Sequence, residues 1–154
     1  MPIKVFFNGD LTVSSTVPGQ GNMSYKSLAI AGFQQWTTAV GNTLDFTEVG
    51  TSAAADLVVN FATISNPTSP VAWSEQYTYS GSTITHATIT LSAQQSGAAI
   101  TPDLLQLMGA ESFGAALGLG QSNNSNDIES ANPSVTAPSQ ADINTLKTLY
   151  CSYF

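Results

Sequence analysis

The sequence predicts an α+β fold in which three helices pack on a mixed β-sheet. Alternating apolar residues mark short strands, as in residues 3–7 and 83–92. Longer segments carry apolar residues at helical spacing, and two of them follow good N-cap residues. Because a strand, a helix and two further strands come first, the chain needs a right-handed crossover, and we expect a mixed sheet.

Composition indicates one globular domain over residues 1–154. The chain has 154 residues, of which 42% are hydrophobic, enough for a sizeable core. Only 8% are charged and the net charge is −7, so nucleic acid and anionic membranes are excluded as partners. No apolar run approaches the length that spans a bilayer. The single cysteine, Cys151, excludes an internal disulfide, and we interpret it as core filler rather than a nucleophile.

The first half of the chain alternates between strands and one helix. Residues 3–7 form a strand with Ile3, Val5 and Phe7 on one face. Residues 24–40 have the apolar spacing of a helix that packs on a sheet, and Gly41 ends it. Residues 43–49 and 55–61 are the next two strands.

The second half contributes two strands and two capped helices. Residues 71–79 form an aromatic-rich strand, followed by the strand at residues 83–92. Thr101 caps a mostly apolar helix over residues 101–117, which Gly118 ends. Ser139 caps the last helix, with Asp142 in the capping-box position. We expect its buried stripe to consist of Ile143, Leu146, Leu149 and Tyr150.

Residues 101–130 resemble the active-site helix and Met-turn of the matrixins, a family of metzincin zinc peptidases. The shared letters lie mainly in GAALGLGQSNNSNDI at residues 114–128. The segments IKVFF, AGFQQWTTAV, LDFTEV and ADLVVNF stand in the order that this family uses, as does LKTLY near the end.

In this resemblance all the chemical positions are replaced. The three zinc-ligand histidines fall on Glu111, Ala115 and Gln121. The general-base glutamate falls on Ser112 and the Met-turn methionine on Glu129. One carboxylate, a methyl group and an amide are a poor ligand set, so we expect no metal and no cofactor. The resulting prediction is an inactive pseudo-peptidase or an engineered, inactivated scaffold.

The resemblance also implies architecture and location. It implies a twisted five-stranded sheet whose edge strand, residues 71–79, runs antiparallel to the other four. It divides the domain into an upper part, residues 1–120, and a small C-terminal part, residues 121–154. Family members are usually secreted, which implies an extracellular protein, although the sequence encodes no recognisable signal peptide.

Two carboxylates suggest a different function, that of an enzyme with a general base. If Glu111 and Glu129 approach the same partly apolar space, burial and mutual repulsion should raise at least one pKa above the ordinary value. Either residue could then abstract a proton from a small substrate. Ser112 is a poor nucleophile because the only histidine, His86, lies on a polar strand face.

A binding or structural role is the other alternative. Val71, Trp73 and Tyr77 of the edge strand, together with Pro133, are the residues expected to line a cleft. An exposed edge strand can pair with a peptide or with another copy of the chain, and the cleft could take a small molecule.

Overall fold

The structure, a computed structural model, describes residues 2–13, 22–62, 73–92, 94–95 and 98–151. Its main strands and helices are β1 (Ile3–Asn8), α1 (Tyr25–Ala39), β4 (Phe46–Glu48), β5 (Leu57–Ala62), β6 (Trp73–Ser80), β7 (Thr83–Ser92), α2 (Pro102–Ala116) and α3 (Gln140–Leu149). Shorter elements are β2 (Thr12–Val13), β3 (Met23–Ser24), a 3₁₀ turn (Ser52–Ala54), β8 (Gln94–Gln95) and β9 (Ala98–Ala99). The predicted α+β class is confirmed.

The main sheet has five strands in the order β4-β1-β5-β7-β6. β1 pairs in parallel with β4 and β5, and β5 pairs in parallel with β7. β6 runs antiparallel to β7 and forms one edge of the sheet. The mixed sheet that the element order predicted is confirmed.

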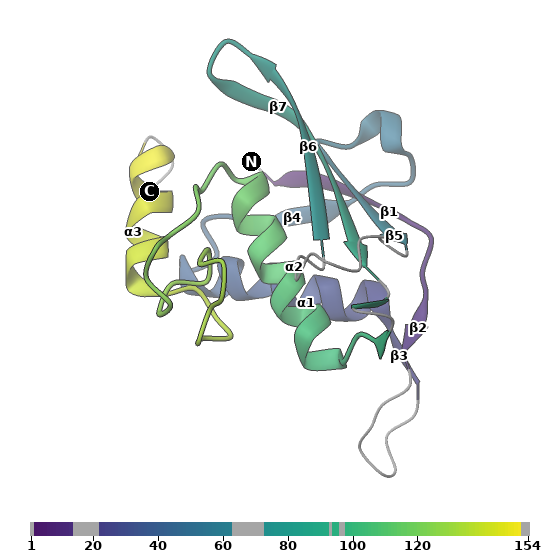
Figure 1. The fold of residues 1–154 in the computed structure, drawn as a ribbon. Helices are drawn as coiled ribbons and strands as arrows, with labels where there is room; N and C mark the ends of the chain where they lie inside the picture. The colour runs from purple at the N-terminus through teal and green to yellow at the C-terminus, as the bar shows by residue number, and fades with distance from the viewer. Residues whose placement is uncertain (1, 14–21, 63–72, 93, 96–97, 152–154) are drawn as a thin grey trace.

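Helices α1 and α2 lie together on one side of the sheet (Figure 1). They approach closely at Gly32, where an added Cβ would lie 2.4 Å from the Gln106 carbonyl oxygen. Phe33 of α1 stacks on Phe113 of α2 with ring centroids 4.3 Å apart. The Trp36 indole Nε1 donates a hydrogen bond of 2.7 Å to the Ala110 carbonyl. These contacts fix α2 against the rest of the core.

Local signals define both ends of α2. The Thr101 hydroxyl accepts a hydrogen bond from the Leu104 N–H, and Pro102 occupies the first turn. At the other end Gly118 adopts a positive φ of 91°. Its N–H donates to Ala115 and the Leu119 N–H donates to Gly114, the paired bonds of a Schellman motif. The chain can therefore turn sharply at Gly118.

The loop between α2 and α3 is held by buried carboxylates. Asp127 accepts hydrogen bonds from Ser122 at 2.6 Å and from Ser139 at 2.8 Å. Asp142 of α3 accepts from the backbone N–H groups of Ser139 at 2.8 Å and Ile128 at 2.9 Å. The first of the Asp142 bonds belongs to the predicted capping box, which is confirmed. These bonds fix the backbone on either side of Glu129.

Several sequence-based expectations differ from the structure. β4 begins at Phe46 rather than at residue 43, because Thr43 forms a turn by donating to the Val40 carbonyl. Leu149 is 52% exposed and does not belong to the buried stripe of α3. Cys151 is exposed rather than core filler, because it follows the end of α3. Within the described residues, every helix is too short or too polar to cross a bilayer.

Candidate functional site

A cleft of about 570 Å³ lies beside the edge strand β6. Its walls come from three parts of the fold, namely the β6–β7 hairpin, the C-terminal end of α2 and α3. The residues that line it are Glu75, Tyr77, Tyr79, Ser82, Thr83, Ile84, Ala115, Leu117, Gly118, Leu119, Leu149 and Tyr150. This volume is in the range of ordinary ligand pockets.

Alternation along β6 brings one acidic and two aromatic side chains to the cleft. Glu75, Tyr77 and Tyr79 are two residues apart and therefore share one face of the strand. The Tyr77 hydroxyl donates a short hydrogen bond to the Glu75 carboxylate. The Tyr77 and Tyr79 rings lie 6.1 Å apart with an interplanar angle of 60°. One wall of the cleft thus combines a carboxylate with two aromatic rings.

Burial raises the pKa of Tyr77 far above its ordinary value, and the hydrogen bond to Glu75 adds to this shift. The phenol is consequently neutral at physiological pH and keeps its proton in the bond to Glu75.

Exposed apolar side chains also gather at this cleft. Among the described residues, the large hydrophobic side chains that remain exposed are Leu11 at 40%, Tyr79 at 58% and Leu149 at 52%. The last two line the cleft from opposite sides, one on β6 and the other on α3. Apolar groups left exposed around a hollow are typical of an interaction site.

Glu129 is a buried carboxyl group close to the cleft. It is 8% exposed, and its Oε1 atom has no hydrogen-bond partner among the described residues. This oxygen lies over Gly114, where an added Cβ would be only 2.0 Å from it and 2.5 Å from Trp36. Burial, followed by the charges of Asp142, Glu111 and Glu75, raises the pKa of Glu129 from 4.5 to about 9. Glu129 is therefore protonated at neutral pH.

The structure places the former zinc-ligand positions in different environments. Glu111 is half-buried on α2, Ala115 is buried in the cleft wall and Gln121 is exposed. Ser112 is fully buried and its hydroxyl donates to the Gly109 carbonyl, so it has no access to a ligand. In the part of the chain that the structure describes, no three His, Cys, Asp or Glu residues are grouped to hold a metal.

The charge of Glu111 contributes to the raised pKa of Glu129, after burial and the charge of Asp142. Their proposed role in catalysis stays a prediction.

The residues expected to line the cleft are only partly brought together. Tyr77 lines it, and Trp73 begins the same strand. Val71 lies outside the described residues. Pro133 is half-buried in the loop before α3 and does not line this cleft. His86 lies on β7, where its Nδ1 is 3.2 Å from the Ala55 carbonyl oxygen.

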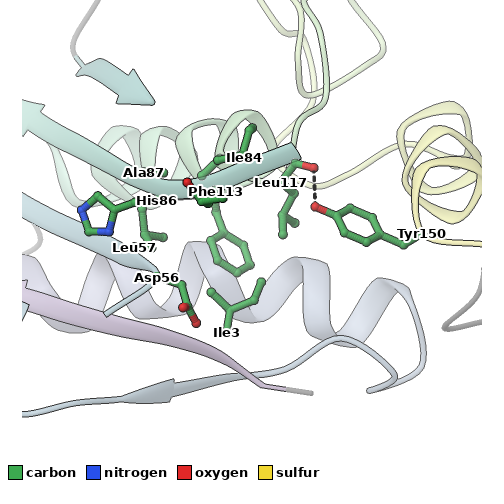
Figure 2. Close-up of a pocket in the computed structure, with 11 residues that line it drawn as sticks. Ile3, Asp56, Leu57, Ile84, His86, Ala87, Phe113, Leu117 and Tyr150 are labelled. Carbon is green, nitrogen blue, oxygen red and sulfur yellow. Dashed lines mark hydrogen bonds between the residues drawn. The ribbon is translucent and has the colours of Figure 1, made fainter. Parts of the chain in front are cut away.

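A second, smaller cavity of about 110 Å³ adjoins the cleft. Ile84, Leu117 and Tyr150 line both spaces. Figure 2 shows Tyr150 reaching from α3 to the Leu117 carbonyl, to which its hydroxyl donates at 2.9 Å. The ring of Phe113 also lines this cavity, which is mostly apolar. Its size suits a few water molecules rather than a large ligand.

Sequence reasoning missed Glu75 and Leu149 as site residues. Glu75 could have been found, because strand alternation places it on the face of Tyr77 and Tyr79. Leu149 carried no such signal, since its helical position indicated burial.

Comparison with known proteins supports the fold only. No protein-family model matches the chain, and no curated protein matches it. The structure is similar to a chain in the GM1-bound form of the ECX AB5 holotoxin, with a TM-score of 0.60 and 13% sequence identity. The match covers 96% of this chain and 79% of that chain.

These findings contradict the identification of the chain as a matrixin. The interpretation as an inactive pseudo-peptidase or inactivated scaffold is wrong for the same reason. Two of the shared letters have structural roles that involve no zinc: Gly114 lies close to Glu129 and Trp36, and Gly118 ends α2 with a positive φ. All the residues that would carry zinc chemistry differ from those of the matrixins. The resemblance therefore rested on residues that shape the helix and the turn.

Proposed function

We propose that this chain is a binding protein that accepts an extended polypeptide along β6, with side chains of the ligand entering the adjacent cleft. The observation that carries the proposal is the position of this cleft, about 570 Å³ in volume, directly beside a sheet edge. In strand addition, backbone hydrogen bonds supply affinity and neighbouring pockets supply specificity. β6 and its cleft provide both parts.

The composition of β6 favours pairing rather than protection. The strand has eight residues, Trp73–Ser80, and its sequence contains neither lysine nor proline, the residues that commonly guard a sheet edge. Ser74, Gln76 and Thr78 are exposed, so no neighbouring element covers their face of the strand. β4, at the opposite edge, has only three residues and offers much less backbone for pairing.

The expected ligand is an extended segment rather than a helix, because the acceptor is the backbone of a strand. Tyr79 and Leu149 would become covered when its side chains enter the cleft. A binding role agrees with the structural similarity to a toxin solved with GM1 bound. An extracellular location, which the sequence resemblance suggested, is kept as part of this proposal.

A peptide titration tests the proposal. The probe is an acetylated and amidated hexapeptide of alternating threonine and valine. Amide hydrogen exchange of the protein is then measured with and without the peptide. We expect slower exchange in β6 and little change in α1. Gln76→Lys places a charge on the edge and should weaken binding. Thr47→Lys is the matched control, since Thr47 is exposed on β4, at the opposite edge of the sheet. Equal binding by both variants, or no protection of β6, would refute the proposal.

Saccharide binding in the same cleft is a second candidate. It is favoured by the Tyr77 and Tyr79 rings and by the hydroxyls of Ser82 and Thr83, which can pack against and hydrogen-bond a sugar. The GM1 named for the similar toxin structure motivates the test. Binding to vesicles that contain GM1, and not to matched vesicles without it, would support this candidate over peptide binding.

A further inference from the structure

We propose that the strand bound along β6 carries a lysine or arginine, whose cation lies between the Glu75 carboxylate and the rings of Tyr77 and Tyr79. This inference rests on the proposed function and specifies its partner, a basic extended segment. Three observations support it: the charge of the cleft, the geometry of the two tyrosine rings in its wall and the apolar residues on its other side.

The charge around the cleft favours a cationic partner over an anionic one. The chain has ten acidic residues against three lysines, for a net charge of −7. None of the lysines lines the cleft, and Lys26 is paired with Glu48 at 2.5 Å. Glu75 lines the cleft, and its charge is felt at Glu129 together with that of Glu111. A cation entering here gains favourable interactions and displaces no resident positive charge.

The carboxylate of Glu75 retains an oxygen for a ligand. The Tyr77 hydroxyl donates to Oε2, whereas Oε1 has no hydrogen-bond partner among the described residues. The hydrogen bond from Tyr77 also orients the carboxylate against the strand. Lysine offers three N–H donors and arginine offers five, so either can bind this remaining oxygen.

The aromatic rings provide the second contact for a cation. Tyr77 and Tyr79 have ring centroids 6.1 Å apart and are inclined by 60°, so they form an angled wall beside Glu75. A cation within about 6 Å of such rings gains cation–π attraction, which is larger when water is excluded. Burial raises the pKa of Tyr77, so its phenol is neutral. The attraction of a cation to this ring is therefore a cation–π interaction rather than an ion pair.

The apolar side of the cleft suits the stem of a long cationic side chain. Leu117 and Leu119 at the end of α2 face the cleft, as does the exposed Leu149 of α3. Lysine and arginine commonly bury their methylene groups against such surfaces while the charged end makes polar contacts. A second copy that paired through its own β6 would not supply this cation, because the β6 sequence contains no lysine or arginine.

The experiment compares three hexapeptides of alternating threonine and valine that differ only in a central lysine, norleucine or glutamate. Dissociation constants come from NMR titration, with amide exchange reporting protection of β6. We expect the lysine peptide to bind roughly five- to tenfold more tightly than the norleucine peptide, and the glutamate peptide to bind most weakly. Salt should reduce the lysine preference.

Two variants locate the preference. Glu75→Gln removes the charge and should abolish most of the lysine preference, measured as the ratio of the norleucine and lysine dissociation constants of that variant. Glu48→Gln is the control, since Glu48 is an acid paired on the surface with Lys26, away from the cleft. Tyr79→Leu removes one ring and should reduce the lysine preference partially. Tyr79 is 58% exposed, so this change should not disturb folding.

The outcomes separate this inference from the proposed function. Protection of β6 by all three peptides with equal affinity would overturn the cation proposal and leave strand addition in place. A lysine preference that survives in Glu75→Gln would also overturn it. Absence of β6 protection with every peptide would refute both.

Discussion

Replacing Glu129 by glutamine should change how the stability of this protein depends on pH. The side chain is 8% exposed and its Oε1 has no hydrogen-bond partner among the described residues. Glutamine has nearly the same shape and carries no charge at any pH. The substitution therefore removes one titration from the folded protein and changes little in its packing.

The size of the effect follows from the pKa of Glu129, which burial raises from 4.5 to about 9 in the folded protein. Between these values the folded state holds a proton that the unfolded state has released. The contribution of Glu129 to stability is thus complete below pH 4.5 and is lost as the pH rises towards 9. The slope is ~1.4 kcal/mol per pH unit, so the loss between pH 5 and pH 8 is ~4 kcal/mol.

The assay is urea unfolding at pH 5, 6, 7 and 8 for the wild type and for Glu129→Gln. We expect the free energy of unfolding of the wild type to fall by ~4 kcal/mol more than that of the variant over this range. A glutamine amide without a partner costs stability at every pH and does not alter the slope. Glu48→Gln, a change on the surface, should follow the wild-type slope. Parallel curves for wild type and Glu129→Gln would refute the reasoning.

Two further predictions concern the supports of the site. Gly32→Ala should lower the free energy of unfolding by about 3 kcal/mol, because its Cβ would lie 2.4 Å from the Gln106 carbonyl oxygen. Gly50→Ala is the control: its Cβ meets nothing within 4 Å, and it should change the free energy of unfolding by at most ~0.5 kcal/mol. Similar melting temperatures for the two variants would contradict this close helix approach. Asp142→Ala should cost about 3 kcal/mol in urea unfolding, since it removes the α3 cap and leaves the buried Ile128 N–H without a partner. A loss below ~0.5 kcal/mol would show that Asp142 does not anchor the loop.

Elements with local signals could be predicted well from the sequence. The Thr101 and Ser139 caps appear where expected, and β7 has the predicted bounds, Thr83–Ser92. Helix caps depend on residues a few positions apart, and strand alternation depends on immediate neighbours. Both can therefore be recognised from the sequence alone. Predictions of features that depend on tertiary packing were less successful. Leu149 is exposed although its helical spacing indicated burial, because the space it faces is the cleft rather than the core.

The site could be predicted only in part. The approach of Glu111 to Glu129 was expected, but it was derived from a family resemblance that the comparisons contradict. The remaining contributors to the environment of Glu129 are Glu75 on β6 and Asp142 on α3. No spacing along the chain relates these positions, because sheet pairing and helix packing bring them together. Their combined effect on one buried carboxyl requires the three-dimensional structure.

The central claim is that an extended polypeptide adds to the sheet at β6. The most direct measurement is a set of intermolecular nuclear Overhauser effects between the bound lysine hexapeptide and isotope-labelled protein. We predict regular cross-strand contacts between peptide backbone protons and backbone protons of Trp73–Ser80, with the lysine side chain near the rings of Tyr77 and Tyr79. Contacts to the face of the sheet or to α3 alone, without a backbone series along β6, would contradict the account.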